Sequence, residues 1–266
     1  MEPEVLLPAT APSGIFTGLG NKTREENARW WNTRAWLIQA MLWLALIDGI
    51  ATIALIQTRH TEPGFTLNGF MSVYMGLMGW FVAFGVIILT QSDVIGEKQS
   101  GTAEWVLSSP LSRESFILSK LIVNLVWLVA ILVVLQGVVF NLVLGALGTG
   151  TIAWSSLLAG LGLQALYLAF WLTLVLMLGT FFRNRNAVIG VPLILVFLQT
   201  LIPSIVGGAG SWVSLLLPQR IPDYAIDLVL GKPLPSLAPI LIVTGAILAF
   251  VLLAILRFNR EEFTGT

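Results

Sequence analysis

Six long apolar stretches are the feature that most constrains the fold of this 266-residue chain. The hydrocarbon core of a bilayer is about 30 Å thick and a helix rises about 1.5 Å per residue, so about 20 apolar residues cross it. Only 11% of the residues are charged, whereas a soluble domain carries about 25%. The sequence therefore predicts an all-α, polytopic membrane protein with six transmembrane helices. The predicted spans are residues 36–57, 69–90, 121–145, 152–180, 187–206 and 237–256.

The basic residues are distributed unevenly among the polar segments. With six spans, Arg59, Arg220 and Lys232 fall on one side of the membrane, and the other 11 of the 14 Lys and Arg residues fall on the opposite side. Five or seven spans would scatter the basic groups over both faces. Because Lys and Arg collect in cytoplasmic segments, we expect a multi-pass protein of the plasma membrane with both termini in the cytoplasm.

The segment before the first span has two parts. Residues 1–20 contain no Lys or Arg, so they lack the basic region of a signal peptide, and we expect residues 1–21 to be a mobile tail. Residues 22–35 combine charges with tryptophans, and Ala28, Trp31 and Ala35 share one helical face, which predicts a helix lying in the membrane interface. A charged flank of the first span is the alternative. The candidate functional residues of this helix are Arg29, Trp30, Trp31 and Arg34.

The segment 91–120 between the second and third spans is longer than a turn between antiparallel helices needs. Thr102 can cap a short helix with Glu104 in its first turn, and Ser109 followed by Pro110 is a second start signal. We therefore expect a compact, charged knob that could dock a soluble protein.

Part of this segment resembles a known family. Residues 96–104 (GEKQSGTAE) and 107–113 (LSSPLSR), followed by Lys120, are similar to the signature of the membrane subunits of type-2 ABC transporters (ABC-2 permeases). The resemblance implies that this region couples to an ATPase, with Glu97 and Glu104 offering carboxylates to basic groups on it. The alternative is that the residues only cap helices and orient the loop. The implied coupling residues are Glu97, Gly101, Thr102, Glu104, Pro110, Ser112 and Arg113.

The same resemblance implies the partners and the direction of transport. ABC-2 permeases work as two permease subunits with two ATPases, so we expect a second copy or a paralogue, a separate ATPase that binds ATP and Mg, and no cofactor or catalytic residue on this chain. A phosphate-binding loop needs Gly before a Lys-Ser/Thr pair, and at the one such pair, Lys22-Thr23, Asn21 stands in the glycine position. The expected activity is export of a hydrophobic or amphiphilic substrate.

The remaining boundaries follow from breaks in the apolar pattern. Residues 207–237 are rich in Gly and Pro and too broken to span, and the resemblance implies half-helices that re-enter the membrane from outside. The permease domain is then 22–257, and residues 258–266 form a cytoplasmic C-terminal tail.

Asp48 is the acidic residue deep within a predicted span, where a carboxyl costs about 3 kcal/mol and must face protein or water. Asp48 and Asn124 are candidates for a translocation path, and a packing role is the alternative. An ion-gradient-driven transporter that uses Asp48 and a membrane anchor for a soluble partner remain rival functions. With no Cys and His60 as the single His, we expect neither a metal site nor an intramembrane enzyme, and a net charge of zero argues against nucleic acid.

Overall fold

The computed structural model describes residues 14–61, 66–100, 111–205 and 212–260. Within these ranges the chain is helical, with no strand, and six helices are long and apolar enough to cross a membrane. The prediction of an all-α membrane protein with six spans is therefore confirmed. The spans are Trp36–Thr61, Leu67–Gln99, Arg113–Ala146, Trp154–Phe181, Arg185–Ile205 and Ala238–Asn259.

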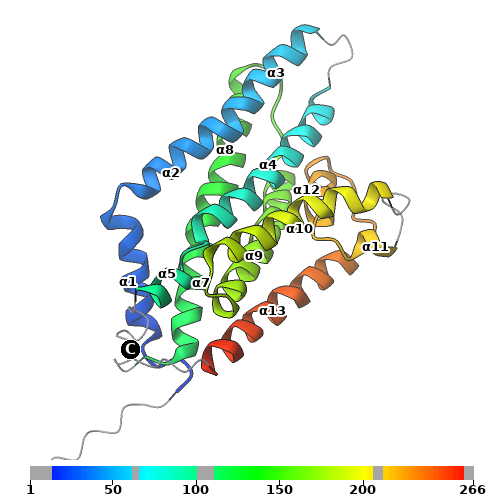
Figure 1. The fold of residues 1–266 in the computed structure, drawn as a ribbon. Coiled ribbons are helices and arrows are strands. Elements are labelled where there is room, and N and C mark those ends of the chain that lie inside the picture. Colours follow the sequence, from blue (N-terminus) through cyan, green and yellow to red (C-terminus); the bar gives the residue numbers. More distant parts are fainter. Residues whose placement is uncertain (1–13, 62–65, 101–110, 206–211, 261–266) are drawn as a thin grey trace, which may run out of the picture.

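Several spans are assembled from consecutive helical segments (Figure 1). The elements of the spans are α2 (Ala35–Trp43), η1 (Leu44–Gly49), α3 (Ile50–Thr61), α4 (Leu67–Thr90), α5 (Ile95–Gln99), α7 (Arg113–Val129), η2 (Ala130–Val134), α8 (Leu135–Ala146), α9 (Trp154–Phe181), α10 (Arg185–Ile205) and α13 (Ala238–Asn259). The elements outside them are α1 (Leu19–Asn32), α11 (Trp212–Leu215) and α12 (Arg220–Val229).

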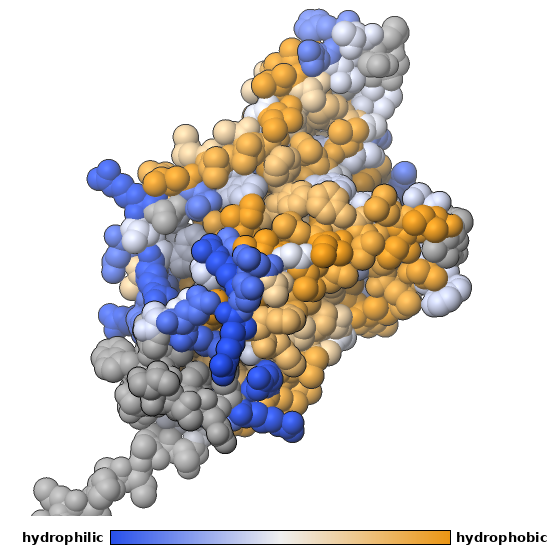
Figure 2. Space-filling model, viewed as in Figure 1, coloured by the Kyte–Doolittle hydropathy of each residue, from blue (hydrophilic) through white to orange (hydrophobic). Residues whose placement is uncertain are grey.

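Helix α9 is the centre of the bundle. It packs against α4, α7, α10, α12 and α13, and its most apolar stretch is 61% buried, compared with 17% for α13. The outer helices therefore present apolar side chains to their surroundings, and Figure 2 shows this hydrophobic surface along the bundle, with hydrophilic residues gathered at its two ends. Such a surface is what lipid chains solvate.

Two π-helical segments interrupt the first and third spans. Segment η1 packs against α8 and α4, and η2 packs against α2 and α4. A π-helical turn is wider than an α-helical turn and is frequent at functional sites. In η1 the wide turn carries Asp48, which is 4% exposed.

The contacts at one end of the bundle unite the segments that hold most of the basic residues. Arg113 donates to the carbonyl oxygens of Phe258 and Asn259, at 3.1 and 2.8 Å, and Gln99 donates to the carbonyl of Arg183 at 2.9 Å. These contacts bring the start of α7, the end of α13 and the α9–α10 turn together. We call this the basic end. An even number of spans places the segments before the first span and after the last span at the same end, as observed here. The assignment of the basic end to the cytoplasm stays a prediction.

The opposite end is closed by α12. A Cβ atom added to Gly160 of α9 would clash with the side chain of Val229 and lie 3.0 Å from the carbonyl oxygen of Ala225, and one added to Gly79 of α4 would lie 3.2 Å from Pro222. Glycine at these positions lets α12 approach both spans closely. Residues 212–237 thus form the short helices α11 and α12 rather than a span, while residues 206–211 lie outside the described ranges.

The N-terminal boundaries differ from the prediction. Helix α1 begins at Leu19, and the hydroxyl groups of Ser112 and Ser115 donate to the carbonyl oxygen of Ile15, at 2.6 and 3.0 Å, so the predicted tail of 1–21 is too long. The predicted interfacial helix of 22–35 ends earlier, because Thr33 adopts an extended conformation. Ala35 therefore belongs to α2, and the expected stripe of Ala28, Trp31 and Ala35 does not lie on one helix.

Candidate coupling site

Five charged side chains from three helices meet at the basic end. We call them the ion cluster: Lys22, Glu26 and Arg29 of α1, Glu97 of α5 and Lys120 of α7. Lys120 Nζ donates to Glu97 Oε1 at 2.7 Å and to Glu26 Oε1 at 3.0 Å. Arg29 Nη1 donates to Glu97 Oε1 at 2.9 Å and to Glu26 Oε2 at 3.2 Å, and Lys22 Nζ lies 3.1 Å from Glu26 Oε1. Glu97 thus links α5 to α1 and α7, and Glu26 links α1 to α7.

Most of the cluster is shielded from solvent. The side chains of Lys120, Lys22, Glu97 and Glu26 are at most 9% exposed, whereas that of Arg29 is 53% exposed. Removing one member of a buried ion pair typically costs about 3 to 5 kcal/mol, because its partner stays buried and uncompensated. The three cations face two carboxylates, and Asp93, just before α5, supplies a third acidic group that interacts with Lys120.

This environment shifts the pKa values of two charged side chains of α1, Glu26 and Lys22. Burial alone would raise the pKa of Glu26, but Lys120, Lys22 and Arg29 outweigh it and hold that pKa below its ordinary value of 4.5. Burial would likewise lower the pKa of Lys22, but Glu26, Glu97 and Glu25 raise it. Both groups therefore carry their charges at neutral pH, so the cluster is ionic.

Aromatic rings extend the cluster to the last span. The ring of Phe116 lies 5.1 Å from Lys120 Nζ and 5.8 Å from Lys22 Nζ, within the range of cation–π attraction. On α13, the ring of Phe258 stacks on Phe116 with centroids 5.1 Å apart and planes 3° from parallel. The end of α13 is thereby connected to the cations.

The segment 91–99 also contacts the end of α9 and the start of α10. Lys98 Nζ donates to the carbonyl oxygen of Thr180 at 3.2 Å, and the side chain of Val94 lies 3.1 Å from where a Cβ would stand on Gly179. Arg185, at the start of α10, donates to Gln91 at 3.0 Å. The segment 91–99 therefore touches α1, α7, α9 and α10 at once.

The structure places the predicted coupling residues in three groups. Glu97 is 6% exposed and bonded within the chain, so the expectation that it offers its carboxylate to another protein is not met. Ser112 caps α7, with Oγ accepting from the Ser115 backbone N–H at 3.1 Å, and Arg113 holds the end of α13. Gly101, Thr102, Glu104 and Pro110 lie outside the described residues.

The predicted residues of the interfacial helix have separate roles. Arg29 belongs to the ion cluster, whereas Arg34 is exposed between α1 and α2. Trp30 stacks on Trp127 of α7 with centroids 5.6 Å apart, and Trp31 meets the same ring edge-on at 4.9 Å. The aromatic face of α1 therefore packs on α7.

Asp48 and Asn124 do not share a site. Tyr74 Oη donates to Asp48 Oδ1 at 3.0 Å in the middle of the bundle, and the ring of Tyr74 stacks on Phe140 at 3.8 Å. Asn124 lies nearer the basic end, where its amide donates to Asp93. The two side chains thus have different partners in different parts of the bundle, and these contacts do not support a single path through both.

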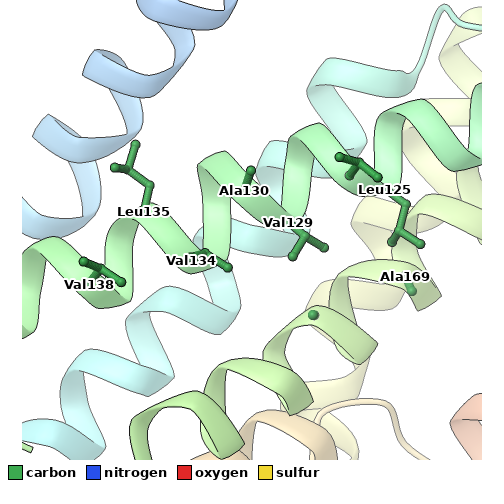
Figure 3. A pocket seen from close by; sticks show the side chains of 9 residues that line it. Leu125, Val129, Ala130, Val134, Leu135, Val138 and Ala169 are labelled. Atoms are coloured by element: carbon green, nitrogen blue, oxygen red, sulfur yellow. The ribbon is translucent and has the colours of Figure 1, made fainter. Parts of the chain in front are cut away.

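An apolar groove runs along the outside of the third and fourth spans. Figure 3 shows its lining from α7, η2, α8 and α9, with Ala169 of α9 across from the α7 end of the groove. Its volume is about 730 Å³, and all nine lining residues are apolar. Such a surface can hold hydrocarbon, but it offers no hydrogen bond or charge for selecting a substrate.

Sequence reasoning missed Lys22, Glu26 and Asp93 as members of a site, and it used Lys120 only as part of the family signature. Lys22 and Glu26 are spaced i, i+4, which allows an ion pair on one helical face. Lys120 directly precedes a long apolar run, and a charge at the start of a span is stabilised by an acidic partner. These signals predict pairing, although none of them identifies the partner on another helix.

Comparison with known proteins identifies the family to which most of the chain is similar. A family model described as "Protein of unknown function (DUF2705)" matches residues 35–264. No curated protein matches the chain. The matched region includes all six spans and the α5 and α7 side of the ion cluster, and it begins after α1.

Proposed function

This chain belongs to the DUF2705 family, and we propose that it is the permease subunit of an ATP-driven exporter, coupled through its basic end to a separate ATPase of the ABC type. In this role it forms a translocation path for a hydrophobic or amphiphilic substrate. It works with a second permease, either another copy or a paralogue. The basic end faces the cytoplasm of a cell whose plasma membrane holds the complex.

The observation that carries the proposal is the set of contacts made by the segment 91–99. Its Glu97 is bonded to Lys120 and Arg29, its Lys98 to the end of α9, and its Gln91 to the start of α10. A force applied to this segment therefore reaches α1, α7 and α9 through buried or partly buried polar contacts, and α10 through an exposed one. The following residues, 101–113, carry most of the resemblance to the coupling region of ABC-2 permeases.

The ion cluster has a distinct role in this mechanism. Because Glu97 is buried, it does not dock the ATPase but anchors α5 to α1 and α7. Closure of the ATPase on ATP pushes the adjoining knob, and the anchor makes α1, α5 and α7 move together. The ATPase binds ATP and Mg, and this chain supplies only the moving helices.

Co-expression with the ATPase encoded beside the gene tests the proposal. The complex is purified in lipid nanodiscs, and ATP turnover is measured for the wild type and for Glu97→Gln combined with Glu104→Gln. We expect the wild type to co-purify with the ATPase and the double variant to lose stimulated turnover. The matched control is Asp223→Asn with Asp227→Asn at the opposite end, which we expect to keep it.

Two results would contradict the proposal. One is a wild-type permease that binds no ATPase. The other is a double variant that is as active as the wild type. Monodisperse elution and an unchanged melting temperature show that each variant is folded.

The buried carboxyl of Asp48 favours a second candidate, a transporter driven by an ion gradient. Its Oδ2 has no hydrogen-bond partner among the described residues, although the side chain is almost fully buried. Buried acidic groups in spans commonly mark ion or proton pathways. Transport into proteoliposomes that needs Asp48 and an ion gradient, but no ATP, would establish this function in place of the first.

A further inference from the structure

A small polar pocket lies at the basic end between α1, α2, α4 and α7. Its volume is about 220 Å³. Five of its seven lining residues are polar or charged, in contrast to the apolar groove of Figure 3. The lining residues are Glu26, Arg29, Trp30, Gln39, Leu89, Asp93 and Asn124.

Three of these side chains have hydrogen-bonding capacity that the described residues do not use. Arg29 donates through Nη1, and its Nε and Nη2 have no described partner. Gln39 accepts through Oε1 from the Trp43 indole at 3.0 Å, which leaves its Nε2 donors without a described partner. Asp93 accepts from Asn124 through Oδ2 alone, and no described cation forms an ion pair with it. The pocket thus offers donors for an anion and a carboxylate for a cation.

The position of the pocket fits the depth of lipid headgroups. Leu89 is in the last turn of α4, and Trp30 stacks on Trp127 beside the pocket. Tryptophan prefers the interface between headgroups and hydrocarbon. The ion cluster contains three cationic and two acidic side chains, and Asp93 places a third carboxyl group beside it.

We propose that this pocket binds the headgroup of an aminophospholipid, with the phosphate on Arg29 and Gln39 and the ammonium group on Asp93. A primary ammonium has N–H donors for the carboxylate, which the quaternary ammonium of phosphatidylcholine lacks. Phosphatidylglycerol has no cation for Asp93. The order of affinity is therefore phosphatidylethanolamine first, then phosphatidylcholine, then phosphatidylglycerol. This site requires only that the chain be embedded in a membrane, so it stands apart from the coupling to an ATPase.

Native mass spectrometry of the permease alone, titrated with the dioctanoyl form of each lipid, tests this proposal. We expect Asp93→Asn to weaken phosphatidylethanolamine binding about tenfold, because a charged hydrogen bond becomes neutral, and not to weaken the binding of anionic phosphatidylglycerol. Asparagine has nearly the same shape as aspartate and can still accept from Asn124. Asp227→Asn, at the opposite end, is the matched control and keeps the wild-type affinity for every lipid.

A measurement on the wild type alone covers the case in which Asp93→Asn does not fold. Free phosphoethanolamine is added as a competitor, and we expect it to bind far more weakly than the lipid because it has no acyl chains. The proposal is overturned if phosphatidylglycerol binds as tightly as phosphatidylethanolamine. It is also overturned if a folded Asp93→Asn variant keeps its preference, or if free phosphoethanolamine binds as tightly as the lipid, which would indicate a site for a soluble ligand.

Discussion

At the basic end, charged side chains of α1, α5 and α7 are buried together, whereas at the opposite end α12 meets α4 and α9 through glycines. Ionic contacts depend on a few atoms, so one new charge or a change of pH can alter them. Close packing depends on the shape of whole helix faces and resists small displacements. The comparison suggests that the basic end is the part suited to receive a signal, and that the opposite end moves as a packed unit.

Lys120→Met is the substitution with the largest expected effect on the basic end. It keeps the apolar length of the side chain but leaves Glu26 and Glu97 without the buried one of the two cations that they share, since Arg29 is half exposed. The expected loss of stability is about 3 to 5 kcal/mol, measured as a lower melting temperature in detergent. Lys232→Met, whose side chain is 61% exposed, is the matched control and should change stability by less than about 0.5 kcal/mol. Equal effects of the two substitutions would remove the contrast between the ends.

Gly160→Ala tests close packing at the opposite end. The new methyl group would meet Val229 and Ala225 of α12, and overpacking of this kind costs about 1 to 3 kcal/mol. Gly162→Ala, on the same helix, meets nothing within 4 Å, so the gain in helix propensity should make it neutral or stabilising. Melting temperatures of the two variants check this prediction, and a Gly160→Ala variant as stable as Gly162→Ala would contradict the packing of α12.

The pH dependence of the ion cluster can be measured through Glu26. Its pKa is below 4.5 in the folded protein, so its stabilising effect is complete well above pH 4.5 and is lost as the pH falls through the folded-state pKa. We expect the wild type to be more stable than Glu26→Gln at pH 7, with the difference shrinking as the pH falls below about 4.5. Melting curves of both proteins from pH 7 to pH 3.5 provide the test. A difference that grows on acidification has the wrong sign for this account.

Asp48→Asn should have the smallest effect. Asparagine can still accept the hydrogen bond from Tyr74, and it removes a charge that is costly inside a membrane. We therefore expect a change in stability below about 1 kcal/mol and retained ATP-driven transport. Transport by the purified complex in liposomes measures the second effect, and its complete loss would contradict this prediction.

The sequence predicted the spans well because their signal is local. Apolar length alone determined the six helices, and the basic residues correctly indicated that the loops following the second and fourth spans lie at the same end as α1 and the end of α13. The π-helical segments η1 and η2 were missed, since an apolar run has the same composition whichever turn it adopts.

The site was predicted only in part, because it depends on contacts between distant segments. Glu97 was singled out by its motif, but its partners Arg29 and Lys120 are 68 and 23 residues away in the sequence. The i, i+4 pair of Lys22 and Glu26 is visible in the sequence, yet only the fold shows that it packs against α7. A carboxylate expected to face a partner protein therefore proved to be an internal anchor.

Site-specific crosslinking tests most directly the central claim that the basic end receives the ATPase. The chain has no cysteine, so Gln99→Cys at the basic end and Lys232→Cys at the opposite end each carry a single reactive thiol. Both are labelled with benzophenone maleimide in the co-expressed complex and illuminated. The account predicts an adduct with the ATPase from position 99 and none from position 232. Adducts of equal yield from both positions, or an adduct from position 232 alone, would contradict it.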